Sequence, residues 1–242
     1  MSLLGAAEDT EVTREGIQEF EKAIKAWDGP AFERAGATLA RAASTDGTAW
    51  LPRYWLAVAR FHQVLYGEQT SDVTTSAEQK KTAREACQAA LEDALKIRPE
   101  DPELHAMLAT LYGMRIATER FGAIRLGPKT VQYRDKALEN GGENPRVQYL
   151  AGMSYLQGPD ILGGASAAVK ALSKAAGLFE KEAQSPAQPG EPRWGRVNCL
   201  AFLGRAQRKS GDTEGAIRSF RAALALNPAD RIAKSELQQL QP

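Results

Sequence analysis

The 242-residue sequence contains few of the residues that carry catalysis and metal binding: two cysteines and two histidines, His62 and His105. No spacing among them suits a zinc site. The sequence has no HExxH motif, no nucleophile elbow and no pair of glutamates that can be assigned to one cleft. We therefore expect a protein that is not an enzyme, with no catalytic residue, no cofactor and no metal.

Net charge is almost absent as well. The chain has 31 Lys and Arg against 30 Asp and Glu, a net charge of +1, which offers no electrostatic basis for binding nucleic acid. It has no apolar run long enough for a transmembrane helix. The first residues form no basic leader. The default expectation is a cytoplasmic protein, or a periplasmic or otherwise exported one if an N-terminal signal was removed.

Small residues, in contrast, recur at regular intervals. The clearest segment runs from Val197 to Asp230 and contains, in order, Leu203, Gly204, Gly211, Asp212, Ala216, Phe220, Ala223 and Pro228. This segment resembles the tetratricopeptide (TPR) repeat, a pair of antiparallel helices A and B. A small residue at position 8 lets helix A approach helix B, and one at position 27 lets helix B approach the next helix A. Pro at position 32 ends helix B.

The same spacing can be traced back through the chain. Position 8 falls on Ala23, Ala57, Ala109, Gly152 and Gly204, and position 27 on Ala42, Ala94, Ala137, Ala175 and Ala223. Two of the steps within a repeat and three of the steps between repeats have the regular TPR length. The pattern predicts an all-α, right-handed α-solenoid, a TPR superhelix, that forms one domain over residues 13–242 after an N-terminal tail at 1–12. The predicted repeats are about 16–49, 50–101, 102–144, 145–196 and 197–230, followed by a capping helix at 229–240.

The predicted A helices are Thr13–Trp27, Trp50–Tyr66, Glu103 to at least Arg115, Pro145–Gln157 and Gly195–Ser210. The predicted B helices are Ala31–Ala43, Ala77–Ile97, Lys129–Glu139, Ala165–Glu182 and Thr213–Leu226, with residues 120–128 irregular. The remaining steps, which lie between Ala57 and Gly204, are longer than the regular spacing, and the step from Ala57 to Ala94 has the largest excess. These excesses predict insertions, chiefly at 67–78, 116–129 and 183–195, and insertions in helical repeats often carry function.

Residues 50–196 also resemble a group of uncharacterised bacterial TPR proteins. The matching residues are Trp50, Leu51, Pro52 and Tyr54; Asn144, Pro145, Arg146, Tyr149 and Leu150; Pro159, Gly163 and Gly164; Ala168, Leu172 and Ala175; and Pro192, Trp194 and Gly195. The resemblance implies a fold and no particular activity. Several such relatives look exported. This chain departs from the group by adding a complete fifth repeat.

In a TPR array the concave groove is lined by helix A, and this rule predicts the binding residues. They are Phe20, Trp27, Tyr54, Phe61, Arg146, Tyr149, Met153, Asn198 and Arg205. An aromatic groove suits an apolar peptide, and we expect the two tyrosines to be partly exposed there. Phe20 and Trp27 could instead cover the N-terminal end of the array. The Lys and Asn residues of a chaperone-type carboxylate clamp are missing from the corresponding positions.

A second candidate site is a basic cluster at the third-repeat insertion. Arg115, Arg120 and Arg125, with Lys129, Arg134, Lys136 and Arg146 near them, could bind a carboxylate or phosphate. The favoured alternative is a solvated face that Glu119, Asp135 and Glu139 neutralise. We interpret Cys87 and Cys199 as small buried hydrophobes rather than a disulfide or redox pair. His62 is expected on the groove surface and His105 in a packed position.

Together these patterns favour a non-catalytic interaction module or scaffold that binds a protein or peptide of unknown identity. The alternatives are a self-assembling structural protein and a small-anion or ligand binder at the arginine cluster. We expect a monomer or a weak homo-oligomer. A repeat of this kind does not by itself identify its partner.

Overall fold

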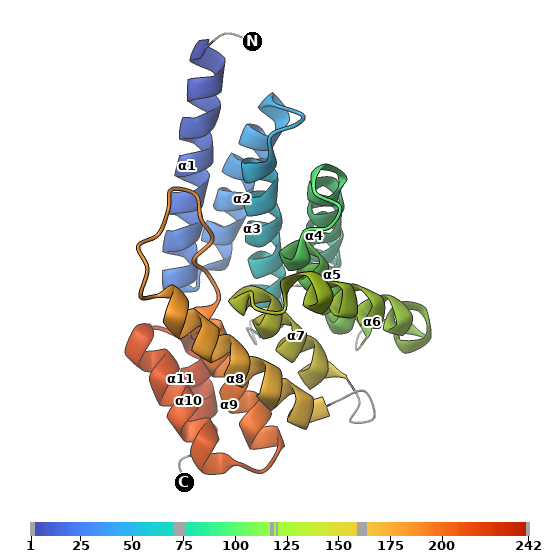
Figure 1. The fold of residues 1–242 in the computed structure, drawn as a ribbon, viewed down its shortest axis with the longest axis vertical. Coiled ribbons are helices and arrows are strands. Elements are labelled where there is room, and N and C mark those ends of the chain that lie inside the picture. The colour runs from blue at the N-terminus through green and yellow to red at the C-terminus, as the bar shows by residue number, and fades with distance from the viewer. Residues whose placement is uncertain (1–2, 70–75, 117–118, 120, 159–163, 241–242) are drawn as a thin grey trace. The chain divides into compact units, whose positions relative to one another are not determined.

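The computed structural model describes residues 3–69, 76–116, 119, 121–158 and 164–240, with the backbone alone for residues 3–10. This part of the chain forms eleven α-helices and contains no β-strand (Figure 1). The prediction of an all-α fold is confirmed. None of the helices in these residues is long and apolar enough to cross a membrane.

The helices pack as consecutive hairpins. In order they are α1 (Leu3–Ala26), α2 (Gly29–Thr45), α3 (Trp50–Gln69), α4 (Ala77–Ile97), α5 (Pro102–Ile116), α6 (Gly122–Gly141), α7 (Pro145–Gln157), α8 (Gly164–Glu182), α9 (Arg196–Lys209), α10 (Thr213–Leu226) and α11 (Arg231–Leu240). From α1 to α10, each odd-numbered helix packs most closely against the even-numbered helix that follows it. Five hairpins and a final helix result, as the spacing of small residues predicts.

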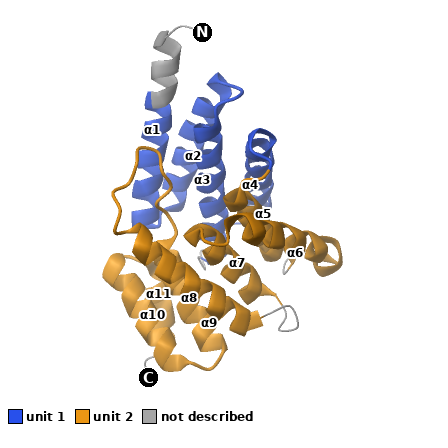
Figure 2. Ribbon diagram, in the orientation of Figure 1, with its two compact units in different colours: residues 1–99 blue, residues 100–242 orange. Residues whose placement is uncertain are grey.

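The chain divides into two compact units (Figure 2). Unit 1 comprises residues 1–99 with helices α1 to α4, and unit 2 comprises residues 100–242 with helices α5 to α11. The prediction of one continuous array over residues 13–242 stays a prediction.

Side chains at the helix N-termini explain why several helices begin where the sequence predicts. The Ser76 hydroxyl accepts a bond from the Gln79 amide (3.1 Å), and the Gln79 side chain accepts one from the Ser76 amide (2.7 Å), which forms a capping box at the start of α4. The Asn144 side chain caps α7 by accepting from the amides of Arg146 and Val147, and Pro145 is the first helical residue. Asp212 accepts from the Gly215 amide at 2.8 Å and caps α10. These are local signals, so they can be recognised in the sequence.

Two helices begin more than five residues earlier than expected. The predicted start of the first helix at Thr13 is wrong, because α1 begins at Leu3; residues 3–12 contain no proline and several strong helix formers, so nothing ends the helix there. The prediction of an irregular segment at 120–128 is wrong for residues 122–128, since α6 begins at Gly122 and contains Pro128. Pro128 deprives only the carbonyl of Ile124 of its helical partner, and Ile124 is exposed to water.

The core of unit 1 is aromatic. The Phe20 ring of α1 lies 6.0 Å from that of Phe32 in α2, and 5.5 Å and 5.0 Å from the rings of Trp55 and His62 in α3. Trp27 packs edge-on against Phe32 at 5.8 Å. All five residues are at most 2% exposed. His62 is therefore a core residue, and its predicted place on the groove surface is wrong.

Unit 2 depends on close approach at small residues. A Cβ atom added at Gly152 of α7 would lie 2.5 Å from Leu172 Cγ in α8, and one added at Gly204 of α9 would lie 2.5 Å from the Phe220 ring in α10. Both distances are shorter than van der Waals contact. The small residue predicted at position 8 is therefore required by the packing of these two hairpins.

A matched pair of glycine substitutions in unit 2 tests this requirement. Gly177, exposed in α8, has no atom within 4 Å of a Cβ built on it. We expect Gly177→Ala to raise the free energy of unfolding by about 0.5–1 kcal/mol through helix propensity. Gly152→Ala gains the same helix propensity, but its new methyl group overpacks Leu172. Its free energy of unfolding, measured by urea titration, should be lower than that of Gly177→Ala by about 1–3 kcal/mol. Equal stability of the two variants would contradict the close packing.

The burial of His62 predicts a dependence of stability on pH. Desolvation lowers the pKa of His62 to about 4, opposed in part by its 2.9 Å bond with the Val58 carbonyl oxygen. The unfolded chain takes up this proton near pH 6.5 and the folded chain does not, so stability falls as the pH falls from 6.5 to 4. Between pH 7 and pH 5 we expect a loss of about 2 kcal/mol, measured by urea unfolding.

His62→Leu provides the control. This variant removes the titrating group, so its stability should change much less between pH 7 and pH 5 than that of the unmodified chain. An unchanged slope in the variant would show that other groups cause the pH dependence.

Candidate functional site

The residues predicted to line an aromatic groove are buried. In unit 1, Phe20, Trp27, Tyr54 and Phe61 are at most 3% exposed, and in unit 2, Tyr149, Met153 and Asn198 are at most 2% exposed. The expectation that the two tyrosines are partly exposed is therefore wrong. Phe20 and Trp27 belong to the aromatic core of unit 1, so neighbouring helices already occupy the faces that were assigned to a partner. That these residues contact a partner stays a prediction.

Arg146 is held inside unit 2 by two carboxylates. Its Nε donates to Glu103 Oε1 at 2.8 Å, and its two terminal nitrogens donate to the two oxygens of Glu182 at 2.8 Å and 3.1 Å. Asn144 also donates to Glu103 Oε1 at 2.7 Å. The network joins α5, α7 and α8. The guanidinium of Arg146 is therefore already paired on two sides, and its part in binding an external anion stays a prediction.

Arg205, the last predicted groove residue, is partly buried and contacts the capping helix. Its Nε lies 2.7 Å from Glu236 Oε1 in α11, and Arg208 lies 3.0 Å from the other oxygen of the same carboxylate. Asp230 caps α11 by accepting from the Ala233 amide at 2.7 Å. Arg205 and Arg208 of α9 thus attach α11 to α9 within unit 2.

The predicted anion site is partly neutralised. Arg115 lies 2.5 Å from Glu119, and Arg125 pairs with the same carboxylate. The hydrogen bond from Arg115 is the main reason that the pKa of Glu119 is lowered. For Arg115 and Arg125 the structure therefore agrees with the alternative of a neutralised face. Arg120 lies outside the described residues.

Both cysteines are buried and unoxidised. Cys87 lies in unit 1 and Cys199 in unit 2, each with its side chain fully buried. Burial raises the pKa of both thiols far above the ordinary value. Neither sulfur is a thiolate at neutral pH, so the interpretation of both as small buried hydrophobes is confirmed. Within the described ranges, no three His, Cys, Asp or Glu side chains come together as a metal site.

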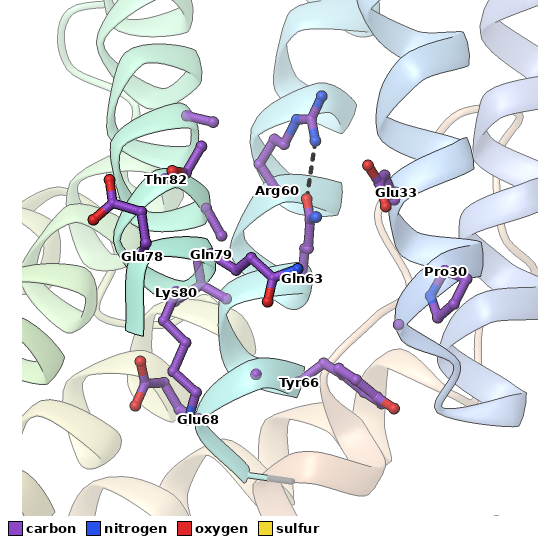
Figure 3. A pocket seen from close by; sticks show the side chains of 15 residues that line it. Pro30, Glu33, Arg60, Gln63, Tyr66, Glu68, Glu78, Gln79, Lys80 and Thr82 are labelled. Carbon is purple, nitrogen blue, oxygen red and sulfur yellow. Dashed lines mark hydrogen bonds between the residues drawn. The ribbon is translucent and has the colours of Figure 1, made fainter. Parts of the chain in front are cut away.

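A cleft in unit 1 is the best candidate site. It has a volume of about 560 Å³ and lies among α2, α3 and α4 (Figure 3). Its lining residues are Gly29, Pro30, Glu33, Arg60, Gln63, Val64, Tyr66, Gly67, Glu68, Glu78, Gln79, Lys80, Thr82, Ala83 and Ala86. Gly29 is required at one end, since a Cβ there would lie 2.5 Å from the Tyr66 ring. The volume is in the range of sites that hold small ligands or single peptide side chains.

Charged groups of both signs surround this cleft. Arg60 is half-buried, and its guanidinium donates to Gln63 Oε1 at 2.9 Å (Figure 3). Among the described residues no carboxylate forms an ion pair with Arg60, nor any cation with Glu33 on the facing helix α2. Glu68 is partly screened by Arg84, whose nitrogen lies 3.6 Å away. The cleft therefore offers a half-buried cation to a ligand that carries a negative charge.

None of the predicted groove residues lines this cleft. The sequence signal that points to it is the largest departure from the regular spacing, the long step between Ala57 and Ala94. This excess lengthens α3 as far as Gln69, and Gly67, Glu68 and Glu78 come from the predicted insertion at 67–78. Residues 70–75 of that insertion lie outside the described residues.

Comparisons with known proteins show a similarity of fold and no membership of a family. No protein-family model matches the chain, and no curated protein matches it. Among solved structures it is similar to the HusA haemophore from Porphyromonas gingivalis, with a TM-score of 0.65 and 18% identity, covering 83% of this chain and 93% of that one. It is also similar to YrrB, a TPR protein with an unusual peptide-binding site, with a TM-score of 0.41, 15% identity and 97% coverage of each chain. The first similarity supports the helical fold, and the second is too distant to support an argument.

The Arg146 network predicts a large effect on stability. Arg146→Met leaves the carboxylates of Glu103 and Glu182 without their shared cation, and Glu103 is only 7% exposed. Breaking such a buried pair should lower the free energy of unfolding by about 3–5 kcal/mol. Lys174→Met is the control, since it breaks a surface pair with Glu143 at 2.6 Å and should cost about 1 kcal/mol or less. Similar losses in the two variants would contradict a special role for Arg146.

Proposed function

We propose that this chain is a non-catalytic binding protein of the TPR type, and that its unit 1 cleft accepts a segment of a protein or peptide carrying a carboxylate. The observation that supports this proposal most directly is Arg60, a half-buried cation in a cleft of about 560 Å³ without an ion-pair partner in the described chain. Helical repeats commonly act by presenting such surfaces to extended segments of other proteins.

Arg60 suits a carboxylate for geometric reasons. A guanidinium has five N–H donors in a planar fork, and Gln63 occupies a donor on one terminal nitrogen. A carboxylate can accept two parallel bonds from the remaining donors, which gives both affinity and orientation. Binding would also offset the cost of keeping the cation half-buried with only a neutral partner.

The other walls of the cleft favour a peptide over a simple anion. Pro30, Val64 and the Tyr66 ring offer apolar contact, while Glu33 and Glu78 would repel a purely anionic ligand and attract a basic side chain or an amino group. A segment with one acidic group, an apolar side chain and a basic or N-terminal group matches all three features. Self-association remains the rival proposal, with the partner segment supplied by a second copy.

The proposal can be tested with peptides selected from a random phage-displayed library against the full chain. Fluorescence anisotropy of a selected, labelled peptide should show that Arg60→Gln weakens binding by roughly tenfold or more, because a charge-assisted bidentate contact is lost. Arg41→Gln, which removes an exposed arginine of α2 outside the cleft, should leave the affinity unchanged. Unfolding curves of both variants check that the fold is intact.

Two results would contradict the proposal. One is selection of peptides that bind Arg60→Gln as tightly as the unmodified chain, which would place their site elsewhere. The other is a failure of any peptide to bind while light scattering shows concentration-dependent dimers, which would favour self-association. Because the structurally similar HusA is a haemophore, haemin is a useful third probe. Saturable haemin binding that Arg60→Gln weakens, without peptide binding, would assign the cleft to a small ligand instead.

A further inference from the structure

The start of α6 in unit 2 exposes two large apolar side chains. Phe121 is 67% exposed and Ile124 is 78% exposed. In the described part of the chain, the other large apolar residues with high exposure are Leu51 and Leu226, at 38% and 44%. Single exposed apolar residues are ordinary, but here the N-cap residue Phe121 and Ile124 in the first turn are exposed together, which makes this helix start a candidate contact surface.

Phe121 also has a strained backbone. Its φ of 60° and ψ of 18° lie in the left-handed region, which a bulky side chain rarely adopts. The following Gly122 explains the constraint, since a Cβ there would lie 2.9 Å from the backbone of Ile116 at the end of α5. This close approach of α6 to α5 leaves Phe121 pointing away from the core. Strain that is kept at an exposed aromatic residue is a reason to look for a function there.

The basic residues near these two side chains are only partly neutralised, by the single carboxylate of Glu119. Arg125 and Lys129 follow along α6, and both are exposed. From residue 115 to residue 129 the sequence has four basic residues and one acidic residue, Glu119, in a chain whose net charge is only +1. Arg115 and Arg125 share Glu119, so one carboxylate faces two cations. The N-terminus of α6 adds a partial positive charge.

We propose that the α6 tip, defined as Phe121, Ile124, Arg125 and Lys129, docks onto an anionic lipid surface. Apolar side chains that project from a cationic base can enter the interfacial region of a bilayer while Arg and Lys contact the headgroups. The chemistry is that of a peripheral contact, independent of the unit 1 cleft.

The observations favour a lipid surface over a protein partner. A stable protein interface buries about 800 Å² on each side and needs a complementary shape around its apolar centre. The α6 tip has two projecting apolar side chains bordered by charged or small residues, among them Ala123 and Gly127. Insertion into a fluid interface needs no matching shape, and the positive charge complements anionic headgroups directly.

Sedimentation of the full chain with lipid vesicles tests the proposal. The vesicles are phosphatidylcholine alone, or phosphatidylcholine with about 30% phosphatidylglycerol, a fraction that gives a clear negative surface potential. We expect binding to the anionic vesicles and little to the neutral ones. Ile124→Ala should weaken binding by roughly tenfold, and Lys129→Gln by about fivefold at low salt with a smaller effect at high salt.

Phe121→Gly separates docking from stability. Glycine adopts the left-handed region without strain, so this variant should unfold at the same or a higher temperature while its vesicle binding falls by roughly tenfold. Leu226→Ala and Arg218→Gln are matched controls on α10, one exposed apolar residue and one exposed arginine of the same unit. Both should bind like the unmodified chain.

Three outcomes would overturn the proposal. The first is no binding to anionic vesicles. The second is binding that Phe121→Gly and Ile124→Ala leave unchanged. The third is a concentration-dependent dimer that Ile124→Ala abolishes in the absence of lipid, which would assign the α6 tip to a second copy of the chain. Peptide binding in the cleft is measured without lipid, so it can succeed or fail independently.

Discussion

The close approach of successive helices at small residues is the constraint on which the rest of this structure depends. At Gly152 and Gly204 the facing helix is so near that a side chain would overlap Leu172 or Phe220. Where helices pack this tightly, as α7 does, most of the helix is buried between its neighbours. The ion pairs of Arg146 and Arg205 then act between packed helices, where the loss of a partner leaves a buried charge.

This enclosure explains why the candidate site differs from the sequence-based prediction. The positions assigned to a groove in unit 1, such as Phe20 and Phe61, carry large apolar side chains because they form the core. A periodic pattern indicates which face of a helix is apolar. It does not show whether that face is buried in the protein's own core or exposed to bind a partner. The cleft is instead lined largely by polar and charged residues, and hydrophobic periodicity makes no prediction about the role of such residues.

The sequence predicts the hairpins well where local chemistry sets the boundaries. The starts of α4, α7 and α10 follow from Ser76, Asn144 and Asp212, each of which bonds to amides only a few positions away. It fails where a long-range contact decides. The partners of Arg146 lie on other helices, 43 residues before it and 36 residues after it. Such contacts leave no short-range signal.

Both proposed binding surfaces lie at or beside departures from the regular spacing. A residue inside a regular hairpin must satisfy packing, so its side chain is constrained by its neighbours. Some residues of the added segments also pack, as Leu126 and Trp194 do, but an exposed side chain with a strained backbone costs stability. Phe121 illustrates the point: glycine would fit its backbone better, and the exposed ring contributes little to the core of unit 2. Arg60 lies in the regular part of α3, beside the added segment, and its half-buried cation is bonded to a neutral glutamine instead of a carboxylate. The physical arguments for a partner are therefore an exposed aromatic residue with a left-handed backbone at Phe121, and at Arg60 a half-buried cation bonded to a neutral side chain.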